Sequence, residues 1–188
     1  PEFKNKKTTV LFNQNWHKGV IGIVASRLIE YYYRPTIILT QANGIVNGSA
    51  RTVDGFDLYN AIDRCGHLLE NYGGHMFAAG LSLKPEKLYT FVETFEKIVS
   101  SSITDELLIP HIEIDDVLEF KDIDARFFKI LHKFEPFGPG NMTPIFASYN
   151  VYDTGSGRTV GKNEEHLKLD LKQESSKNFF FPAIGFNL

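Results

Sequence analysis

The sequence predicts an α/β (α+β) domain followed by a smaller, mostly β domain that ends in a small β-barrel. Strand-like runs alternate with amphipathic helices as far as about residue 102, a connector follows, and apolar residues then alternate one by one near the end of the chain. Hydrophobic residues make up 43% and charged residues 23%, as in an ordinary globular protein. We therefore expect two domains, at residues 1–108 and 109–188.

The first domain is expected to begin with a strand, a helix and a second strand. The strand covers residues 8–13, and apolar residues recur at helical spacing from Gly19 to Tyr33. Arg34-Pro35 ends that helix before the strand at 36–40. Further on we expect a strand at 45–51, a short helix near 57–64, the glycine pair 73–74, a strand near 79–83, and a helix from Pro85 whose apolar stripe is Leu88, Phe91, Val92, Phe95, Ile98 and Val99.

The second domain is expected to start with one strand and one helix and to continue as β structure. The strand covers residues 111–116, and the helix carries Phe127, Ile130, Leu131 and Phe134 on one face. Leu167, Leu169 and Leu171 alternate with polar residues, which indicates a half-buried strand at 166–172. The remaining expected elements are strands at 146–152 and 179–186 and a turn-rich loop at 154–165. Since the sequence stops at residue 188 without a turn signal, the expected barrel need not be complete.

The cysteine count, the apolar runs and the net charge of the chain favour some classes of protein and exclude others. One cysteine, Cys65, forms no internal disulfide, and the sequence opens with no leader of the signal-peptide type, so we expect a cytoplasmic protein. No apolar run approaches the roughly 20 residues that span a bilayer, which excludes a membrane role. The net charge of −3 divides into +2 over residues 1–80 and −5 over the rest. Any nucleic-acid site must therefore be a local arrangement of cations and backbone amides.

Three polar segments edged by glycine are candidate binding sites. The first, residues 16–22, places His17 and two glycines at the start of a helix, where free N–H groups favour an anion. The alternative is that Gly22 allows close packing and His17 fills a turn. Arg27, farther along this helix, is either a second contact or a solvated charge.

The second segment, residues 48–55, places Ser49 and Arg51 two apart on a strand, so both side chains point the same way. A hydroxyl and a planar guanidinium on one face suit a phosphate. The alternative is a polar strand face paired with Asp54 or Asp57. The third segment combines Gly74 and its glycine neighbour with His75, and by itself it is typical of a turn with a structural histidine. Together the three segments predict a cradle for a sugar-phosphate backbone.

The ordered motifs WHKGVIGIVASRL, GSARTVDGFDLYNAI, GGHMFAAGLSL, FEPFGPGN and EEHLKLDL resemble the rear half of the RecJ family of bacterial single-strand-specific exonucleases. The resemblance implies that the first three belong to a DHH-associated domain and the last two to an oligonucleotide-binding (OB) barrel. It also implies phosphate contacts by Arg27, Ser49, Arg51, Gly74 and His75. The sequence departs from the family pattern at Thr52, where serine is common, and at Met142, where proline usually follows Gly-Asn.

Phosphodiester hydrolysis in this family is a two-metal reaction, and the sequence lacks the Asp-His-His signature that would support it. Asp115-Asp116, Asp122 with Asp124, and Glu164-Glu165-His166 come nearest, but helix capping and a polar hairpin loop explain them more simply. Cys65 and His67 are too isolated for zinc. We expect no catalytic residue, metal or cofactor in this chain; Mg²⁺ or Mn²⁺ belongs to a catalytic DHH domain N-terminal to it.

The sequence thus predicts the single-stranded-DNA-binding portion of a RecJ-type 5′→3′ exonuclease of DNA repair and recombination. Its expected partners are single-stranded DNA, the absent DHH domain and other repair proteins. His17, Lys168 and Lys172 are candidate secondary contacts with the strand. Two alternatives remain: a fragment of an oligoribonuclease or another DHH-family phosphoesterase, and a module that binds a repair factor.

Overall fold

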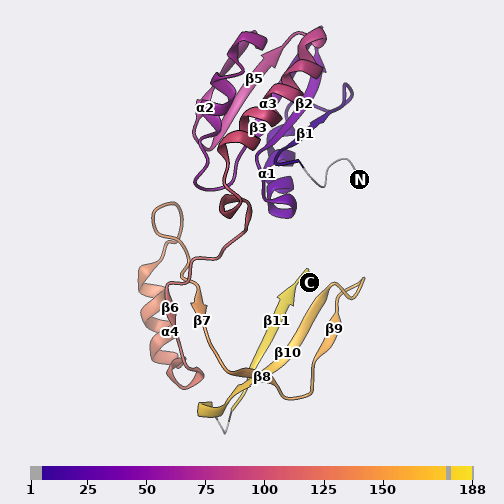
Figure 1. Cartoon of the computed structure of the whole chain (residues 1–188). Helices are drawn as coiled ribbons and strands as arrows, with labels where there is room; N and C mark the ends of the chain where they lie inside the picture. The colour runs from indigo at the N-terminus through magenta and orange to yellow at the C-terminus, as the bar shows by residue number, and fades with distance from the viewer. Residues whose placement is uncertain (1–5, 177–178, 188) are drawn as a thin grey trace. The chain divides into compact units, whose positions relative to one another are not determined.

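The computed structural model describes residues 6–176 and 179–187 of the chain (Figure 1). It divides the chain into two compact units, residues 1–111 and 112–188, which are described one at a time. The ends of the two expected domains, residues 1–5 and 188, lie outside the described residues. No helix within 6–176 and 179–187 is long and apolar enough to cross a membrane.

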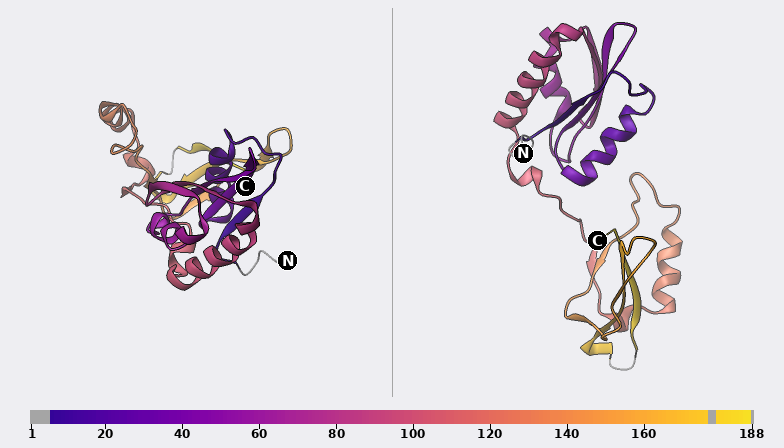
Figure 2. Two further views of the ribbon diagram at one scale, coloured as in Figure 1. Left: turned by 90° about the horizontal axis from the view of Figure 1, so that it is seen from above. Right: turned by 90° about the vertical axis from the view of Figure 1, so that its right-hand side faces the viewer.

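The first unit is a five-stranded sheet with helices on both faces. Its strand order is β1-β2-β3-β5-β4; β1 runs parallel to β2 and the other neighbours are antiparallel. Figure 2 shows, in its right-hand view, helices α1 and α3 on opposite faces of this sheet. The bounds are β1 Thr9–Phe12, α1 Ile21–Tyr32, β2 Thr36–Ala42, β3 Ile45–Arg51, α2 Leu58–Asp63, β4 Asn71–His75, β5 Ala78–Leu83 and α3 Leu88–Ser102, with 3₁₀ turns at Gly66–Leu68, Pro85–Lys87 and Glu106–Leu108.

The two faces of this sheet bury very different amounts of apolar surface. Alternation along the strands sends one set of side chains to a large core beneath α2 and α3, which includes Phe91, Phe95 and Val99. The opposite face holds only a small cluster, in which Ile21 and Ala25 of α1 cover Ile38 of β2. The α1 face of β3, β5 and β4 is therefore the place where polar side chains can line the sheet.

Most predicted elements of the first unit are confirmed, including the strand–helix–strand start and the apolar stripe of α3. Strand β4 was not predicted: Gly73 and Gly74 lie inside it, although a glycine pair by itself is more typical of a turn. They pair in register with Gly80 and Ala79 of β5. A local glycine signal does not reveal this, since the pairing partner lies farther along the chain.

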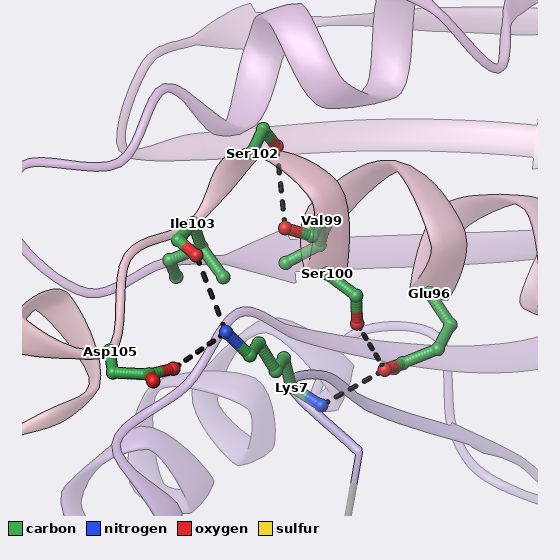
Figure 3. A network of polar contacts seen from close by, with 7 residues as sticks. All are labelled: Lys7, Glu96, Val99, Ser100, Ser102, Ile103 and Asp105. Carbon is green, nitrogen blue, oxygen red and sulfur yellow. Dashed lines mark hydrogen bonds and ion pairs between the residues drawn. The ribbon is translucent and has the colours of Figure 1, made fainter.

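The carboxylate of Glu96 on α3 binds the segment that leads into β1. Glu96 accepts hydrogen bonds from the backbone N–H of Lys7 at 3.0 Å and of Thr8 at 3.1 Å, and from the hydroxyls of Thr8 and Ser100. The Lys7 ammonium reaches Asp105 at 2.6 Å and the Ile103 carbonyl, beyond the end of the helix (Figure 3). These contacts cross about ninety residues of sequence and hold the segment before β1 against α3.

The second unit is an open β structure with one short helix. Strands β8, β10 and β11 form a sheet in the order β11-β10-β8, and β9 also pairs with β10, while β6 and β7 form a separate parallel pair. The bounds are β6 Asp116–Val117, α4 Ala125–Leu131, β7 Phe146–Ala147, β8 Val151–Asp153, β9 Arg158–Val160, β10 His166–Gln173 and β11 Phe181–Phe186, with 3₁₀ turns at Phe120–Asp122, His132–Phe134 and Glu174–Ser176.

Three predictions for this unit need correction. The strand expected at 111–116 shrinks to β6, because a strand needs a partner and only residues 116–117 pair with β7. The strand expected at 146–152 is two strands, interrupted where Asn150 adopts a positive φ of 56°. The loop at 154–165 contains β9. The described strands leave the sheet unclosed, which agrees with an incomplete barrel.

Side-chain amides organise the connections of this unit. Asn141 donates to the carbonyls of Phe134 at 2.7 Å and Pro136 at 3.0 Å, which folds the FEPFGPGN segment into a closed loop. Buried Gln173 accepts from the Phe120 N–H at 2.8 Å and donates to the Tyr149 carbonyl at 2.7 Å. The FEPFGPGN segment thus has a structural role of its own.

We expect Glu96→Gln to lower the free energy of unfolding by about 1–3 kcal/mol at neutral pH, because an amide has one acceptor oxygen for the four donors. Burial alone would raise the pKa of Glu96, but its hydrogen bonds with Thr8, Lys7 and Ser100 lower it below the ordinary value. A carboxylate with a lowered pKa stabilises the fold above its unfolded pKa of about 4.3, and this contribution is lost as the pH falls through the folded pKa.

Urea titrations across the acid range should therefore show the two proteins converging below a pH of about 4.3. Lys97→Ala, on an exposed position of the same helix, is the matched control and should leave stability unchanged. A difference between Glu96→Gln and the unaltered chain that persists undiminished in acid would contradict the role given to the carboxylate.

Candidate nucleic-acid interface

Ser49 and Arg51 lie next to each other at the end of β3, on its α1 face. Arg51 Nη1 donates to Ser49 Oγ at 3.2 Å and to the Ala50 carbonyl at 2.8 Å, so the predicted shared orientation of the two side chains is confirmed. Both bonds use the same nitrogen of a group that has five N–H donors. The half-buried guanidinium is therefore held in place while donors remain for a ligand.

The first turn of α1 lies against this pair. A Cβ on Gly22 would come within 3.1 Å of Ser49 Oγ and 3.2 Å of Arg51 Nη2. The helix begins after Val20 without a side-chain cap. The first N–H groups of a helix have no intrahelical acceptor, and here no side chain caps them. The positive end of the helix dipole therefore lies beside a hydroxyl and a guanidinium.

The sheet register places His75 on the same face as Arg51. Arg51 pairs with Ala78 of β5, and Ala78 pairs with His75 of β4. Side chains that pair across neighbouring strands share a face, so Arg51 and His75 flank the small Ala78 across two strand spacings, roughly 10 Å. We call Ser49, Arg51, His75 and the first turn of α1 the cradle.

His75 presents a donor to whatever the cradle holds. Its Nδ1 accepts from the Phe77 N–H at 3.3 Å. In the neutral imidazole the proton then resides on Nε2, which can donate to an anion. The ring also lies edge-on to Phe77, with centroids 6.0 Å apart.

The glycines of this sheet do two different things. Gly74 has φ of +153°, and a Cβ there would lie 2.2 Å from the Ala78 carbonyl oxygen, so the strand requires glycine at this position. Its register partner, Ala79, is turned toward the large core. A Cβ on Gly73 or Gly80 would instead meet nothing within 4 Å, so these two leave the sheet surface bare beside Ser49.

Arg27 and His17 are not brought to the cradle by any contact among the described residues. Arg27 lies five residues after Gly22, about 140° round the helix. It is 71% exposed and bound to Glu30 at 2.9 Å, and the hydrogen bond to Glu30 raises its pKa. His17 Nδ1 accepts from the Gly19 N–H at 3.1 Å in the turn before α1. Both residues therefore make local contacts, as in the alternatives in which His17 fills a turn and Arg27 is a solvated charge.

A hollow that the sequence did not predict continues from the cradle. It has a volume of about 380 Å³ and is lined by Lys18, Asn47, Asn71, Ser82, the glycines 48, 73 and 80, and residues 72 and 81. Its polar residues are dispersed between positions 18 and 82. Only the alternation of Asn47, Ser49 and Arg51 along one strand signalled that the polar face extends this far.

Lys168 and Lys172 lie on one face of β10 in the second unit. Lys168 pairs with Arg158 of β9 and Ile184 of β11, and Lys172 pairs with Tyr152 of β8. Tyr152 and Ile184 are exposed. Asp170 lies between the two lysines on this face and accepts from the Ser156 hydroxyl at 2.8 Å. Lysines interleaved with apolar and aromatic side chains are an arrangement that suits single-stranded nucleic acid.

Asp115, Asp124 and Glu165, three of the acidic residues singled out in the sequence, have structural partners. Asp124 caps α4 by accepting from the Phe127 N–H at 2.7 Å, and Asp115 accepts from the Ile145 N–H at 2.8 Å. Glu165 accepts from the Asn163 N–H at 2.7 Å within its loop. Over residues 6–176 and 179–187, no group of three or more His, Cys, Asp or Glu side chains is arranged to hold a metal ion. The donor set of these residues does not fit a two-metal centre.

The fold agrees with what known proteins show. The chain belongs to the DHHA1 family, since the DHHA1 domain matches residues 5–101, more than half of its length. The RecJ OB domain matches residues 114–188. The chain is 34% identical over 180 residues to the single-stranded-DNA-specific exonuclease RecJ of Bacillus subtilis, and 31% identical over 183 residues to RecJ of Escherichia coli, covering 95% of this chain in both cases.

Solved structures agree. The crystal structure of RecJ from Thermus thermophilus in complex with Mg²⁺ matches with a TM-score of 0.77 and 29% identity over 89% of this chain and 26% of that chain. The complex with Mn²⁺ also has a TM-score of 0.77, at 25% identity over 97% of this chain. The chain spans 22% and 31% of the length of the B. subtilis and E. coli proteins and corresponds to their C-terminal part.

We expect Gly74→Ala to destabilise the first unit by about 1–3 kcal/mol, because alanine disfavours this backbone conformation and its methyl would meet the Ala78 carbonyl. Gly73→Ala is the matched control and should change stability by less than about 0.5 kcal/mol, since its methyl meets open space. Thermal unfolding of both variants measures the difference. Equal effects at the two neighbouring positions would contradict the special role of Gly74.

Proposed function

We propose that this chain grips single-stranded DNA for a RecJ-type 5′→3′ exonuclease of DNA repair and recombination. The observation that carries the proposal is the shared face of Arg51 and His75 beside the uncapped start of α1. Cutting is assigned to a DHH domain N-terminal to this chain, which would supply the Mg²⁺ or Mn²⁺ chemistry. That domain and other repair proteins are the proposed partners, and the cytoplasm is the proposed location.

Each part of the cradle contributes a donor to one phosphate. The Arg51 guanidinium supplies a charged donor, His75 Nε2 and the Ser49 hydroxyl supply uncharged donors, and the first N–H groups of α1 add the positive end of the helix dipole. Gly74 contributes by fixing the course of β4. The cradle holds and orients a strand, and no group in it is arranged to activate water. Arg27 enters the proposal only as an outer contact, since Glu30 already binds it.

Two other functions would use the same fold. A fragment of an oligoribonuclease or another DHH-family phosphoesterase would prefer short RNA. A repair-factor module would bind neither RNA nor single-stranded DNA. The interleaved lysines and apolar side chains of β8–β11 favour a long single strand. Binding of single-stranded DNA that strengthens with length would distinguish the first proposal from both alternatives.

We expect Arg51→Ala to weaken binding of a 5′-phosphorylated oligothymidylate to the 188-residue chain about tenfold, because it removes the charged donor of the cradle. Fluorescence anisotropy at fixed salt measures this affinity. Lys97→Ala also removes one cation, but from the opposite side of the sheet, and should leave the affinity unchanged. The strand should stay intact when Mg²⁺ or Mn²⁺ is added. Equal affinities of the two variants would refute the cradle.

We expect the double substitution Lys168→Glu with Lys172→Glu to weaken binding of long strands and to reduce its dependence on salt, because two cations leave the sheet face of the second unit. The same titration with short and long oligothymidylates separates the contributions of the two units. A short strand that fills only the cradle should bind as before. If the affinity for long strands is unchanged, this face of the second unit serves another partner.

A further inference from the structure

The hollow beside the cradle is built from residues that four segments bring together. Asn47 pairs with Ser82 of β5, and Ser82 pairs with Asn71 of β4, so one cross-strand row carries three polar side chains on the α1 face. Lys18, from the loop before α1, donates to Asn47 Oδ1 at 2.8 Å and closes one side. The volume of about 380 Å³ is sufficient for one small planar group.

The hollow and the cradle lie on one continuous surface, the α1 face of β3, β5 and β4. The rows run in order Arg51–Ala78–His75, then Ser49–Gly80–Gly73, then Asn47–Ser82–Asn71. Successive rows lie two residues apart along a strand, about 6.8 Å. The middle row is bare, since a Cβ on Gly73 or Gly80 would meet nothing. A ligand anchored at Arg51 can therefore lie across flat peptide surface and reach the polar row.

The cradle and the hollow differ in the chemical groups that line them. The cradle has a fixed cation and donors, which suit a phosphate, whereas the hollow is lined by two amides and a hydroxyl that both donate and accept. Its single cation, Lys18, is already bound to Asn47. Within residues 6–176 and 179–187, the side chains of Asn71 and Ser82 make no hydrogen bond. Neutral groups with mixed donors and acceptors match the edge of a nucleobase better than a second phosphate.

We propose that the hollow binds the base of the nucleotide next to the phosphate held in the cradle. The inference rests on the proposed function, since the strand must first be anchored by Arg51. The base lies flat on the bare backbone at Gly73 and Gly80, and its edge meets Asn71 and Ser82. The first unit then holds one nucleotide by both its phosphate and its base, which fixes the direction in which the strand leaves the cradle.

The test compares two strands of equal length, a 5′-phosphorylated oligothymidylate and a 5′-phosphorylated abasic strand that keeps the sugars and phosphates. We expect Asn71→Ala to weaken binding of the oligothymidylate to the 188-residue chain about fivefold and to leave the abasic strand unaffected. Gly80→Val fills the bare row, and its side chain enters open space, so the fold should persist while oligothymidylate binding falls about tenfold. Gly138→Val, also directed into open space but in the second unit, is the control for adding this side chain.

Failure of this inference and failure of the proposed function give different results. Suppose that Arg51→Ala weakens binding of both strands, whereas Asn71→Ala and Gly80→Val bind the oligothymidylate normally. The cradle is then supported and the base site is overturned. If Asn71→Ala weakens both strands equally, the hollow holds sugar and phosphate, which also overturns it. If Arg51→Ala affects neither strand, the proposed function itself fails. Asn71 is exposed, so its substitution keeps the test valid even if Gly80→Val does not fold.

Discussion

The close approach of α1 to β3 is the constraint on which the cradle depends. Gly22 permits it, because any Cβ at this position would press on Ser49 and Arg51 at little more than 3 Å. With glycine there, the helix start, the hydroxyl and the guanidinium share one small region, although they come from segments almost thirty residues apart. A longer side chain at this position would push apart the helix start, Ser49 and Arg51.

The unequal cores of the first unit explain where the site lies. The face beneath α2 and α3 excludes water and supplies most of the apolar burial, so it specifies the fold. The α1 face buries little beyond Ile21, Ala25 and Ile38, and the rest of it is free to carry polar residues and bare glycine. Stability and binding are thus assigned to opposite faces of one sheet, and substitutions on one face need not compromise the other.

The sequence predicted the elements whose periodicity is local and missed those that depend on distant pairing. The stripe of α3 and the strand at 45–51 were found because their patterns repeat within one segment. Strand β4 was missed because glycines conceal a strand until its partner β5 is known. The barrel was expected with longer strands, but Asn150 interrupts one of them and residues 111–115 pair with no strand.

The sequence likewise predicted part of the candidate site and missed the rest. Residue types indicated that Ser49 and Arg51 act together, and the register places His75 on their face. Arg27 was assigned by resemblance, but it binds Glu30, an i,i+3 pair that the helical spacing allows, in line with the alternative of a solvated charge. Asn71 and Ser82 escaped notice because an isolated polar residue on a strand gives no signal until neighbouring strands align it with others.

The loop that Asn141 closes explains why the departure from the family pattern at the next residue is tolerated. The side chain of Asn141 donates to the carbonyls of Phe134 and Pro136, and its backbone pairs with that of Gly138, while Met142 is 74% exposed. The shape of the loop therefore does not depend on the ring of a proline at position 142. Natural variation can proceed at this position as long as its neighbour keeps a carboxamide, so Asn141 is the residue on which selection should act.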